Sequence, residues 1–359
     1  MPSLRAFIAE LDRHGLLMRV QKEVDWKYEI GRISRENALP ILFENIKDYP
    51  DKSLFVNGLA NYPAFAVALG IHDRKIGYNA LVAHLRRSFS MPIPPVLAEG
   101  PLRWENRMTG ALDLSILPVP WWSEFDANRY LGTWHLNISC DPETGQRNIG
   151  VYRMQILGPS TATISISNRS DVARQVGKAE KSGKVLPMAI AIGVDERLVI
   201  GAAAAPSYGT DEYSLAGGLF GRPIEIIRCE TQPLEVPADS EVVIEGYIRP
   251  DIRVKDGPFL DYAGVPNTNP RAFLFQATAL FFRHNLIFRG TAVGRAGAED
   301  HQLYSILAGA HVADFHGSRL RHFLQTFLLR HRAFRLFQLT GKFGHLSRAR
   351  LIPLNSRKR

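Results

Sequence analysis

Short runs of β-forming residues follow one another through the centre of the chain, and this succession most limits the folds that it can adopt. Gly and Pro separate the runs at intervals that are typical of a β-barrel or a β-sandwich. Helical spacing interrupts them at residues 171–182, after an N-cap at Ser170 or Asp171, and again at 211–220. We therefore predict a β-rich domain over residues 111–300. The runs cover residues 134–139, 150–157, 162–166, 188–193, 198–203, 223–229, 241–248, 272–281 and 286–291.

The first 110 residues have the pattern of an α/β domain. Apolar residues at helical spacing predict a helix after Ser3, which is a suitable N-cap, and a further helix over residues 78–89. The continuous apolar run at residues 64–70 ends in Gly and predicts a buried strand. Residues 90–125 are rich in proline, which excludes a regular helix and indicates an extended connector.

Positive charge is concentrated at the C-terminal end. Residues 316–359 contain eleven Lys and Arg and no Asp or Glu, so the net charge of +9 leaves −2 for everything before them. An apolar stripe that includes Leu320, Phe323 and Phe327 lies beside the arginines and predicts a basic amphipathic helical tail over residues 301–359. Three interpretations stay open: an interface helix, a peripheral contact with an anionic membrane, or a truncation. Nucleic-acid binding is disfavoured, because no aromatic stacking platform accompanies the arginines.

Several classes of protein are disfavoured by what the sequence lacks. No apolar run reaches the length of a membrane span, and the first residues do not resemble a signal peptide. Cys140 and Cys229 are far apart and lack metal-type spacing, which favours a reduced, cytoplasmic protein. The sequence contains no phosphate loop, zinc-protease motif, paired-cysteine motif or nucleophile elbow.

A polar pattern inside an apolar run gives the first indication of a site. Residues 148–155 have the alternation of a buried strand, yet Asn148 and Arg153 fall within it at an odd spacing, which places them on opposite faces. A buried amide and a buried guanidinium are costly unless each has a partner. An edge strand with one solvated face is the alternative, and the pattern alone favours it.

Three acidic residues complete the set of candidates. Glu212 lies at the predicted start of a helix, and Asp256 and Asp261 flank a Gly-Pro turn. Such a turn brings two carboxylates to one side of a pocket, where their proximity raises one pKa and permits general-acid catalysis. An ordinary turn with two solvated acids explains the pattern at least as well.

The order of these segments resembles the UbiD family of prenylated-FMN-dependent (de)carboxylases. The most specific match is Asp-Pro-Glu-Thr-Gly at residues 141–145 followed by Asn-Ile-Gly-Val-Tyr-Arg-Met-Gln at 148–155. The resemblance begins near residue 4 and fades after about residue 295. It implies an α+β protein whose central domain is a split β-barrel of the flavin-reductase type. Further matches lie at residues 4–8, 22–25, 42–47, 117–120, 132–133, 225–229, 234–238, 241–246 and 256–259.

The resemblance also implies prenylated FMN, a divalent metal such as Mn²⁺, and K⁺. Asn148 and Glu212 match two of the family's metal ligands, whereas Asn168 stands where the family has a His. Hard oxygen ligands suit these ions, but an amide does not replace an imidazole electronically. The positions that match the flavin-binding residues are Asn148, Val151, Tyr152, Arg153, Ile164, Ser165, Ile166, Arg169, Ser170 and Glu212.

The implied activity is non-oxidative, reversible decarboxylation of an aromatic or α,β-unsaturated carboxylic acid through a covalent adduct with the flavin. Arg153 matches the residue that orients the carboxylate, Asp261 matches the proton donor, and Asp256 stands where the family usually has a Glu. A non-catalytic flavin-binding or scaffold subunit of a UbiD-type complex is the alternative. The implied partners are further copies of the chain and a UbiX-type flavin prenyltransferase that supplies the cofactor.

Overall fold

The computed structural model describes residues 3–73, 75–99, 103–132, 134–294 and 297–311. Residues Met1–Val312 form one compact unit. Residues 301–311 of the predicted basic tail belong to helix α8 (Glu299–His311), and the rest of that tail lies outside the described residues. No helix within the described ranges is both long enough and apolar enough to cross a membrane.

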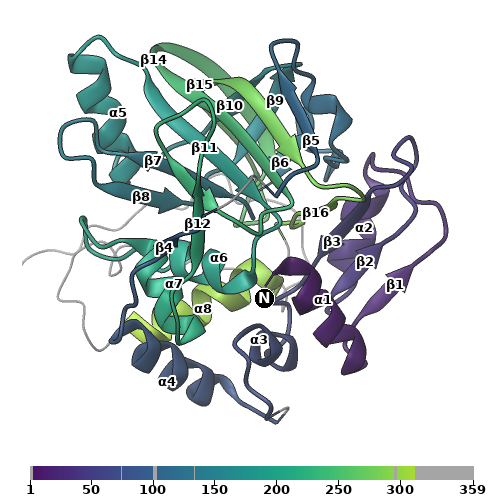
Figure 1. The fold of residues 1–359 in the computed structure, drawn as a ribbon. Helices are drawn as coiled ribbons and strands as arrows, with labels where there is room; N and C mark the ends of the chain where they lie inside the picture. Colours follow the sequence, from purple (N-terminus) through teal and green to yellow (C-terminus); the bar gives the residue numbers. More distant parts are fainter. Residues whose placement is uncertain (1–2, 74, 100–102, 133, 295–296, 312–359) are drawn as a thin grey trace, which may run out of the picture. The chain divides into compact units, whose positions relative to one another are not determined.

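A small sheet with flanking helices forms the N-terminal part (Figure 1). Its strand order is β1-β2-β3-β16, in which β16 comes from far along the chain and pairs in parallel with β3. The first helix begins where the sequence predicts, because the Ser3 hydroxyl accepts a hydrogen bond from the Ala6 amide. The elements are α1 (Leu4–Arg13), β1 (Met18–Val20), α2 (Glu29–Glu36), β2 (Ile41–Phe43), β3 (Ser53–Val56), α3 (Tyr62–Ala68), α4 (Tyr78–Phe89) and β16 (Ile287–Arg289).

Two of the predicted strands are wrong. The apolar run at residues 64–70 belongs to helix α3, where the Asn61 side chain caps the Ala64 amide at 2.9 Å and a proline occupies the first turn. The run at 198–203 belongs to helix α6 (Glu196–Ala203). Asp195 is its N-cap, and the Asp195 side chain accepts a hydrogen bond from the Arg197 amide at 3.0 Å. In both cases the capping residue decides, because a short apolar run fits a buried helix as well as a strand.

The proline-rich connector is extended, as predicted. It contains the short strands β4 (Val96–Leu97) and β5 (Asn106–Thr109) and the 3₁₀ turn η1 (Leu114–Ile116). Strand β4 joins β12 and β13 in a three-stranded sheet, and β5 pairs with β15. The connector therefore links several parts of the Met1–Val312 unit.

The largest sheet has nine strands in the order β6-β9-β10-β15-β14-β11-β7-β8, with β5 on β15. Its centre is a long antiparallel hairpin of β14 and β15. In the described residues this order is an open path, so no closed barrel is present. The strands are β6 (Tyr130–Gly132), β7 (Leu136–Cys140), β8 (Arg147–Gly150), β9 (Met154–Gly158), β10 (Thr161–Ile164), β11 (Leu186–Ile192), β14 (Val242–Leu260) and β15 (Pro266–Phe282).

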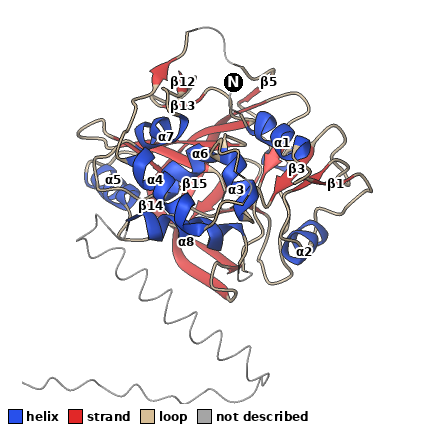
Figure 2. Cartoon of the chain, turned by 90° about the horizontal axis from the view of Figure 1, so that it is seen from below, coloured by secondary structure: helices blue, strands red, loops and turns tan. Residues whose placement is uncertain are grey.

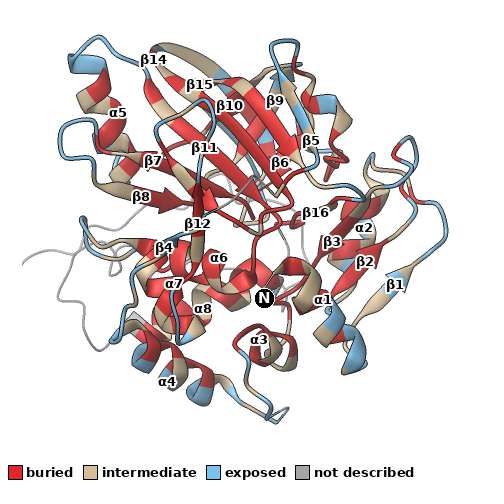
Figure 3. Cartoon of the chain, viewed as in Figure 1, coloured by how far each residue is buried: buried red, intermediate tan, exposed pale blue. Residues whose placement is uncertain are grey.

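Alternating side chains on this sheet contribute to two hydrophobic cores. On β11, Ala189 and Ala191 face one core, whereas Met188, Ile190 and Ile192 face the other. The turn end of the β14–β15 hairpin is partly exposed, whereas Figure 3 shows β7 and β11 as almost continuously buried. Such burial on both faces accounts for the weak alternation of these strands in the sequence.

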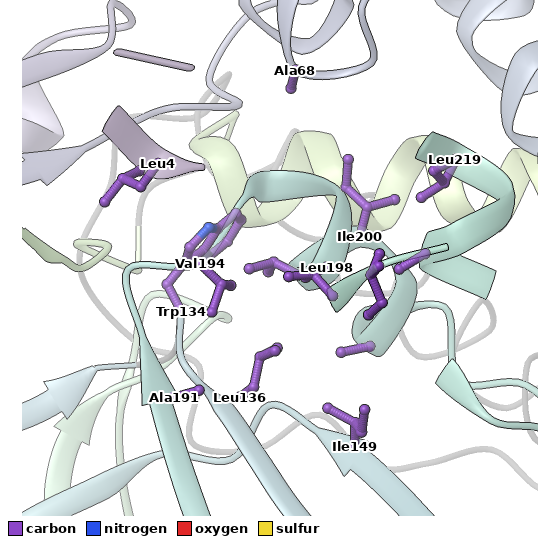
Figure 4. Packing of buried hydrophobic residues seen from close by; sticks show 14 of the residues in the cluster. Leu4, Ala68, Trp134, Leu136, Ile149, Ala191, Val194, Leu198, Ile200 and Leu219 are labelled. Atoms are coloured by element: carbon purple, nitrogen blue, oxygen red, sulfur yellow. The ribbon is translucent and has the colours of Figure 1, made fainter. Parts of the chain in front are cut away.

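Helices cover one face of the sheet and contribute to the first core. Figure 4 shows Leu136 and Ile149 of the sheet facing Leu198 and Ile200 of α6. Seen from below, α3, α4, α6 and α8 lie grouped in front of the strands (Figure 2). The remaining elements are α5 (Asp171–Lys181), α7 (Glu212–Phe220), β12 (Glu225–Arg228), β13 (Glu235–Pro237) and α8 (Glu299–His311).

A buried ion triad connects β16, α6 and α8. Arg289 is 1% exposed; its Nε donates to Glu196 at 2.6 Å and its Nη2 donates to Glu299 at 2.6 Å. Glu299 also accepts from the main-chain amides of Asn57 and Leu59, beside the N-terminal sheet. The triad therefore joins four segments that are distant in the sequence.

Candidate functional site

Three irregular residues connect strands that lie near opposite ends of the large sheet. Strand β8 is the last in the sheet order and β9 is the second, yet only residues 151–153 separate them in the chain. Three residues span at most about 11 Å, so the sheet must curve strongly. The continuous strand predicted over 150–157 is therefore wrong: Asn148 lies on β8, and Arg153 lies just before β9.

Strand β7 fixes the main chain of this connection. The Tyr152 amide donates to the Asn137 Oδ1 atom at 2.9 Å. Asn137 belongs to a polar row with His135 and Ser139, and all three side chains are fully buried. Ser139 in turn donates to Gln175 of α5 at 2.6 Å. The polar face of β7 thus holds the connection in place, while its apolar face enters the first core.

Asn148 and Glu212 come together at the β8 end. The Glu212 Oε2 atom accepts from the Ile149 amide at 3.1 Å, and burial raises the pKa of Glu212 to about 8. The Asn148 side chain is 6% exposed, and its Nδ2 has no hydrogen-bond partner within the described part of the chain. The side chains of Asn148 and Glu212 therefore both lie next to the Ile149 amide. Each carries an oxygen atom, and the raised pKa of Glu212 favours its uncharged form.

Tyr152 links this end to helix α5. Its hydroxyl lies near the side chains of Ser170 and Asn148, without a hydrogen bond to the Asn148 Nδ2 atom, and burial raises the pKa of the phenol. The ring lies against Gly150, where any Cβ would be 2.4 Å from the Tyr152 Cε2 atom. Only glycine fits at this position while the ring keeps its place.

The other predicted residues of this end lie on and after β10. Ile164 and Ile166 are buried, and Ser165 accepts from the Asn269 side chain at 3.1 Å. Asn168 and Arg169 are exposed in the turn before α5. No hydrogen bond among the described residues connects Asn168 with Asn148 or Glu212, and the same residues hold no cluster of three His, Cys, Asp or Glu side chains suited to a metal.

Arg153 and Asp256 form a buried ion pair at the β9 end. The Arg153 Nε and Nη2 atoms both lie 2.7 Å from the Asp256 Oδ1 atom. Asp256 is fully buried, and its Oδ2 accepts from the Thr163 hydroxyl at 2.5 Å. The Arg153 guanidinium also lies 5.3 Å from the centre of the Phe259 ring. Asp256 and Phe259, both on β14, thus hold the guanidinium in one position, and Thr163 of β10 holds Asp256.

Gln155, on strand β9 two residues after Arg153, contributes hydrogen bonds around the Arg153–Asp256 pair. Its Oε1 accepts from the Gly257 amide at 2.9 Å and from the Tyr130 hydroxyl at 3.3 Å. The main-chain amide of Gln155 donates to the Thr163 hydroxyl oxygen at 3.0 Å. Arg153, Asp256, Thr163, Gln155 and Tyr130 therefore belong to one hydrogen-bonded network.

Asp261 lies outside this network. Its Oδ1 accepts from the Ala263 amide at 2.8 Å, and its Oδ2 accepts from the Asn267 side chain at 3.2 Å. The side chain is partly exposed in a tight turn, whereas Asp256, five residues earlier, is fully buried. The turn does not bring the two acids into contact in this conformation.

Two buried ionisable residues next to the site, Asp126 and His135, carry no signal in the sequence. Asp126, in the loop after the paired tryptophans, is 4% exposed and accepts from the Leu260 amide at 2.7 Å. His135 is fully buried beside Tyr152, and burial lowers its pKa to about 4. Neither residue lies in a recognisable motif. Only their burial in the folded chain distinguishes them from ordinary surface residues.

Two family models match the chain. The Rift-related domain of 3-octaprenyl-4-hydroxybenzoate carboxy-lyase matches residues 96–296, and the N-terminal domain of the same enzyme matches residues 8–81. The chain belongs to the UbiD family. The resemblance seen in the sequence is thus confirmed for the family.

Relatives of this UbiD-family chain include phenolic acid decarboxylases. That of Streptomyces sp. (strain D7) is 31% identical over 304 residues, which cover 81% of this chain and 64% of the relative. That of Bacillus subtilis (strain 168) is 28% identical over 310 residues, which cover 82% and 64%. The chain therefore spans about two thirds of the length of these curated relatives.

Solved structures of UbiD-class enzymes share the fold. An evolved dimeric form of HmfF from Pelotomaculum thermopropionicum, in complex with prenylated FMN, has a TM-score of 0.79 at 30% identity and covers 87% of this chain and 71% of its own. Vanillic acid decarboxylase from Sedimentibacter hydroxybenzoicus, in closed form, has a TM-score of 0.82 at 29% identity and covers 86% and 67%. The mixed α/β architecture of the UbiD family is confirmed.

Proposed function

We propose that this chain is a carboxy-lyase that removes CO₂ non-oxidatively from an aromatic or α,β-unsaturated carboxylic acid with the help of prenylated FMN. Membership of the UbiD family and the phenolic acid decarboxylases among its relatives support the proposal. The observation that carries it is the connection at residues 151–153, which joins an Asn148–Glu212 pair at one end to an Arg153–Asp256 pair at the other.

The residues at the β8 end fit a flavin phosphate held by a divalent metal. The Asn148 Nδ2 atom is a donor that would suit a phosphate oxygen, its Oδ1 would be the ligand for a metal, and Glu212 is a buried acid that a cation would deprotonate. Amide and carboxylate oxygens are ligands that suit Mn²⁺, and K⁺ prefers oxygen as well. We propose Asn148, Glu212 and Asn168 as the metal ligands. The remaining flavin contacts would come from Val151, Tyr152, Ile164, Ser165, Ile166, Arg169 and Ser170.

At the β9 end the protein would hold the substrate carboxylate. Arg153 uses Nε and Nη2 on Asp256, and its Nη1 has no hydrogen-bond partner in the described part of the chain. That amino group would donate to the carboxylate and orient the bond that breaks. Bound prenylated FMN supplies the electron sink for carbon–carbon cleavage.

Asp261 would donate the proton that takes the place of CO₂ on the product carbon. Its partners are the Ala263 amide and the Asn267 side chain, and neither is an ionised group. A change in the turn at residues 261–264 would bring the carboxyl toward Arg153. The same groups would serve carboxylation, because a catalyst accelerates both directions.

Other parts of the proposal concern the whole protein. We propose that the curved central sheet is the split β-barrel of a cofactor domain at residues 111–300, after an α/β domain at 1–110. A homo-oligomer is supported by the dimeric form of HmfF. We further propose a cytoplasmic protein that receives its cofactor from a UbiX-type prenyltransferase. The tail at residues 301–359 would form either a contact between copies or a peripheral membrane contact.

Reconstitution tests the proposal. The chain is co-expressed with a flavin prenyltransferase, purified with Mn²⁺ and K⁺, and supplied with hydroxybenzoic and cinnamic acids. We expect the absorbance of bound prenylated FMN and the release of CO₂ from at least one acid. Asp261→Asn should keep the bound flavin and lose turnover, whereas Asp251→Asn, which changes an exposed acid paired with Arg249, should keep both. Bound flavin without CO₂ release in the wild type would instead support a non-catalytic flavin-binding subunit.

A further inference from the structure

The loop at residues 123–128 is fastened to the end of strand β14. The Asp126 Oδ1 atom accepts from the Leu260 amide at 2.7 Å, and the Ala127 amide donates to the Pro258 carbonyl at 2.7 Å. The bonded segment lies between the two acids of the proposed site, since Asp256 precedes it and Asp261 follows it directly. A displacement of this segment would move Asp261 relative to Arg153.

The loop itself is well anchored. The Asp126 amide donates to the Ser123 carbonyl at 3.1 Å, and the Trp121 indole donates to the Asp126 carbonyl at 2.9 Å. On the other side, Arg35 of α2 donates to the Trp122 carbonyl at 2.8 Å. Asp126 is therefore a fixed point to which the end of β14 is attached.

The Asp126 carboxyl is unusual for a turn residue. It is 4% exposed, and its Oδ2 has no hydrogen-bond partner in the described residues. The positive charges that face it are Arg153 and Arg35, and burial nevertheless raises its pKa to about 6. A buried carboxyl with one unused oxygen is costly, which favours a specific task for the other oxygen.

We propose that Asp126 is a positioning residue of the decarboxylase site, which holds residues 257–260 in place so that the turn that follows them can bring the proton donor Asp261 to the Arg153–Asp256 pair. This inference rests on the proposed function and assigns a residue to it. Asp126 acts through the Leu260 amide and not on the substrate. An error of about 1 Å in such an arrangement lowers the rate by up to roughly 100-fold.

The test compares Asp126→Ala with Asp126→Asn in the reconstituted full chain. The asparagine keeps a carbonyl oxygen for the Leu260 amide, so its kcat should stay within about threefold of the wild type. The alanine should lower kcat by roughly 10- to 100-fold and change KM less than threefold, with the bound flavin retained. Equal activity of Asp126→Ala and the wild type would overturn the proposal.

Asp195 provides a matched control. It is 5% exposed and accepts from the Arg197 amide at 3.0 Å, but its amide partner is in α6. Asp195→Ala should leave kcat unchanged at a temperature where the protein is folded. A fall in kcat equal to that of Asp126→Ala would mean that general loosening, and not positioning, lowers the rate.

Hydrogen exchange tests the attachment without turnover. Peptides that cover residues 257–264 should exchange faster in Asp126→Ala and at the wild-type rate in Asp126→Asn. An unchanged rate in the alanine variant would contradict the inference whether or not the chain decarboxylates any acid. If the wild type shows no CO₂ release while the exchange pattern holds, the proposed function fails and the attachment stands.

Discussion

The Thr163 hydroxyl donates at 2.5 Å to the Asp256 oxygen that Arg153 does not use. Asp256 is fully buried, so each of its oxygens meets a partner within the protein. The same hydroxyl oxygen accepts from the Gln155 amide at 3.0 Å. Thr163 therefore connects the acid of the ion pair to the main chain of β9.

Replacing Thr163 by Val tests this connection. The change keeps the shape of the side chain but leaves one Asp256 oxygen and the Gln155 amide without partners. We expect a loss of about 1–3 kcal/mol in the free energy of unfolding. Urea denaturation measures it, and Thr163→Ser, which keeps the hydroxyl, should lose far less. A negligible loss in Thr163→Val would show that the hydrogen bond does not contribute to stability.

The Arg153–Asp256 pair is suited to a double-mutant cycle. Arg153→Met leaves Asp256 buried without its counter-ion, which should cost about 3–5 kcal/mol of unfolding free energy. Asp256→Asn added to that variant should recover part of the loss, since a neutral amide is less costly to bury. Denaturation of the wild type, both single variants and the double variant gives the coupling, for which we expect about 0.5–3 kcal/mol. Additive losses would contradict a direct pair.

His135 should make the protein sensitive to acid. Its pKa is about 4 in the folded protein against an ordinary value of 6.5, so between these values the unfolded chain binds a proton that the folded chain does not. Stability from this group is therefore complete above pH 6.5 and lost as the pH falls toward 4, by up to roughly 3 kcal/mol. His135→Phe should flatten that part of the stability profile, measured by urea denaturation at several pH values. A profile parallel to the wild type would exclude His135 as the source.

The buried triad around Arg289 should contribute more to stability than any surface pair. Arg289→Met leaves Glu196 and Glu299 buried without their cation, which should cost about 3–5 kcal/mol. Arg249 pairs with Asp251 on the surface, so Arg249→Met should change stability by less than about 1 kcal/mol. Thermal denaturation of both variants checks the difference, and similar melting temperatures would contradict it.

Glu212 should control metal binding at the proposed site. Glu212→Gln removes the carboxylate that accepts from the Ile149 amide, next to Asn148, so Mn²⁺ affinity should fall by at least about tenfold. The signal of free Mn²⁺ in electron paramagnetic resonance measures it without any turnover. Glu143 is an exposed acid in the turn between β7 and β8, the strand that carries Asn148. Glu143→Gln should leave the Mn²⁺ affinity unchanged. Equal affinity in the Glu212 variant would remove this residue from the ligand set.

Local signals in the sequence predicted many of the elements. Helix α5 follows its cap at Ser170, and α7 begins at Glu212 within a residue of the expected start. Helix α3 was mistaken for a strand, because Asn61 and Pro63 were not recognised as helix-start signals. The residues that flank a short apolar run decide whether it forms a helix or a strand, whereas the composition of the run does not.

The site depended on long-range contacts that no pattern contains. Glu212 bonds to the Ile149 amide across 63 residues, and Asp256 pairs with Arg153 across 103. The resemblance to the UbiD family nominated all of these residues, whereas alternation alone favoured an edge strand. Asp126 escaped both approaches, because its role depends on a main-chain amide 134 residues away.

Strand β7 has two buried faces of opposite character. Leu136 and Ile138 enter a hydrophobic core, while His135, Asn137 and Ser139 form the polar row behind residues 151–153. The substitutions that the strand tolerates should therefore differ between neighbouring positions, because apolar core residues alternate with buried polar residues. Core positions should accept other aliphatic side chains, whereas Asn137 and Ser139 should accept only side chains that keep their hydrogen bonds. Variation among natural or engineered versions of this strand would then change with a period of two, although every position is equally hidden from solvent.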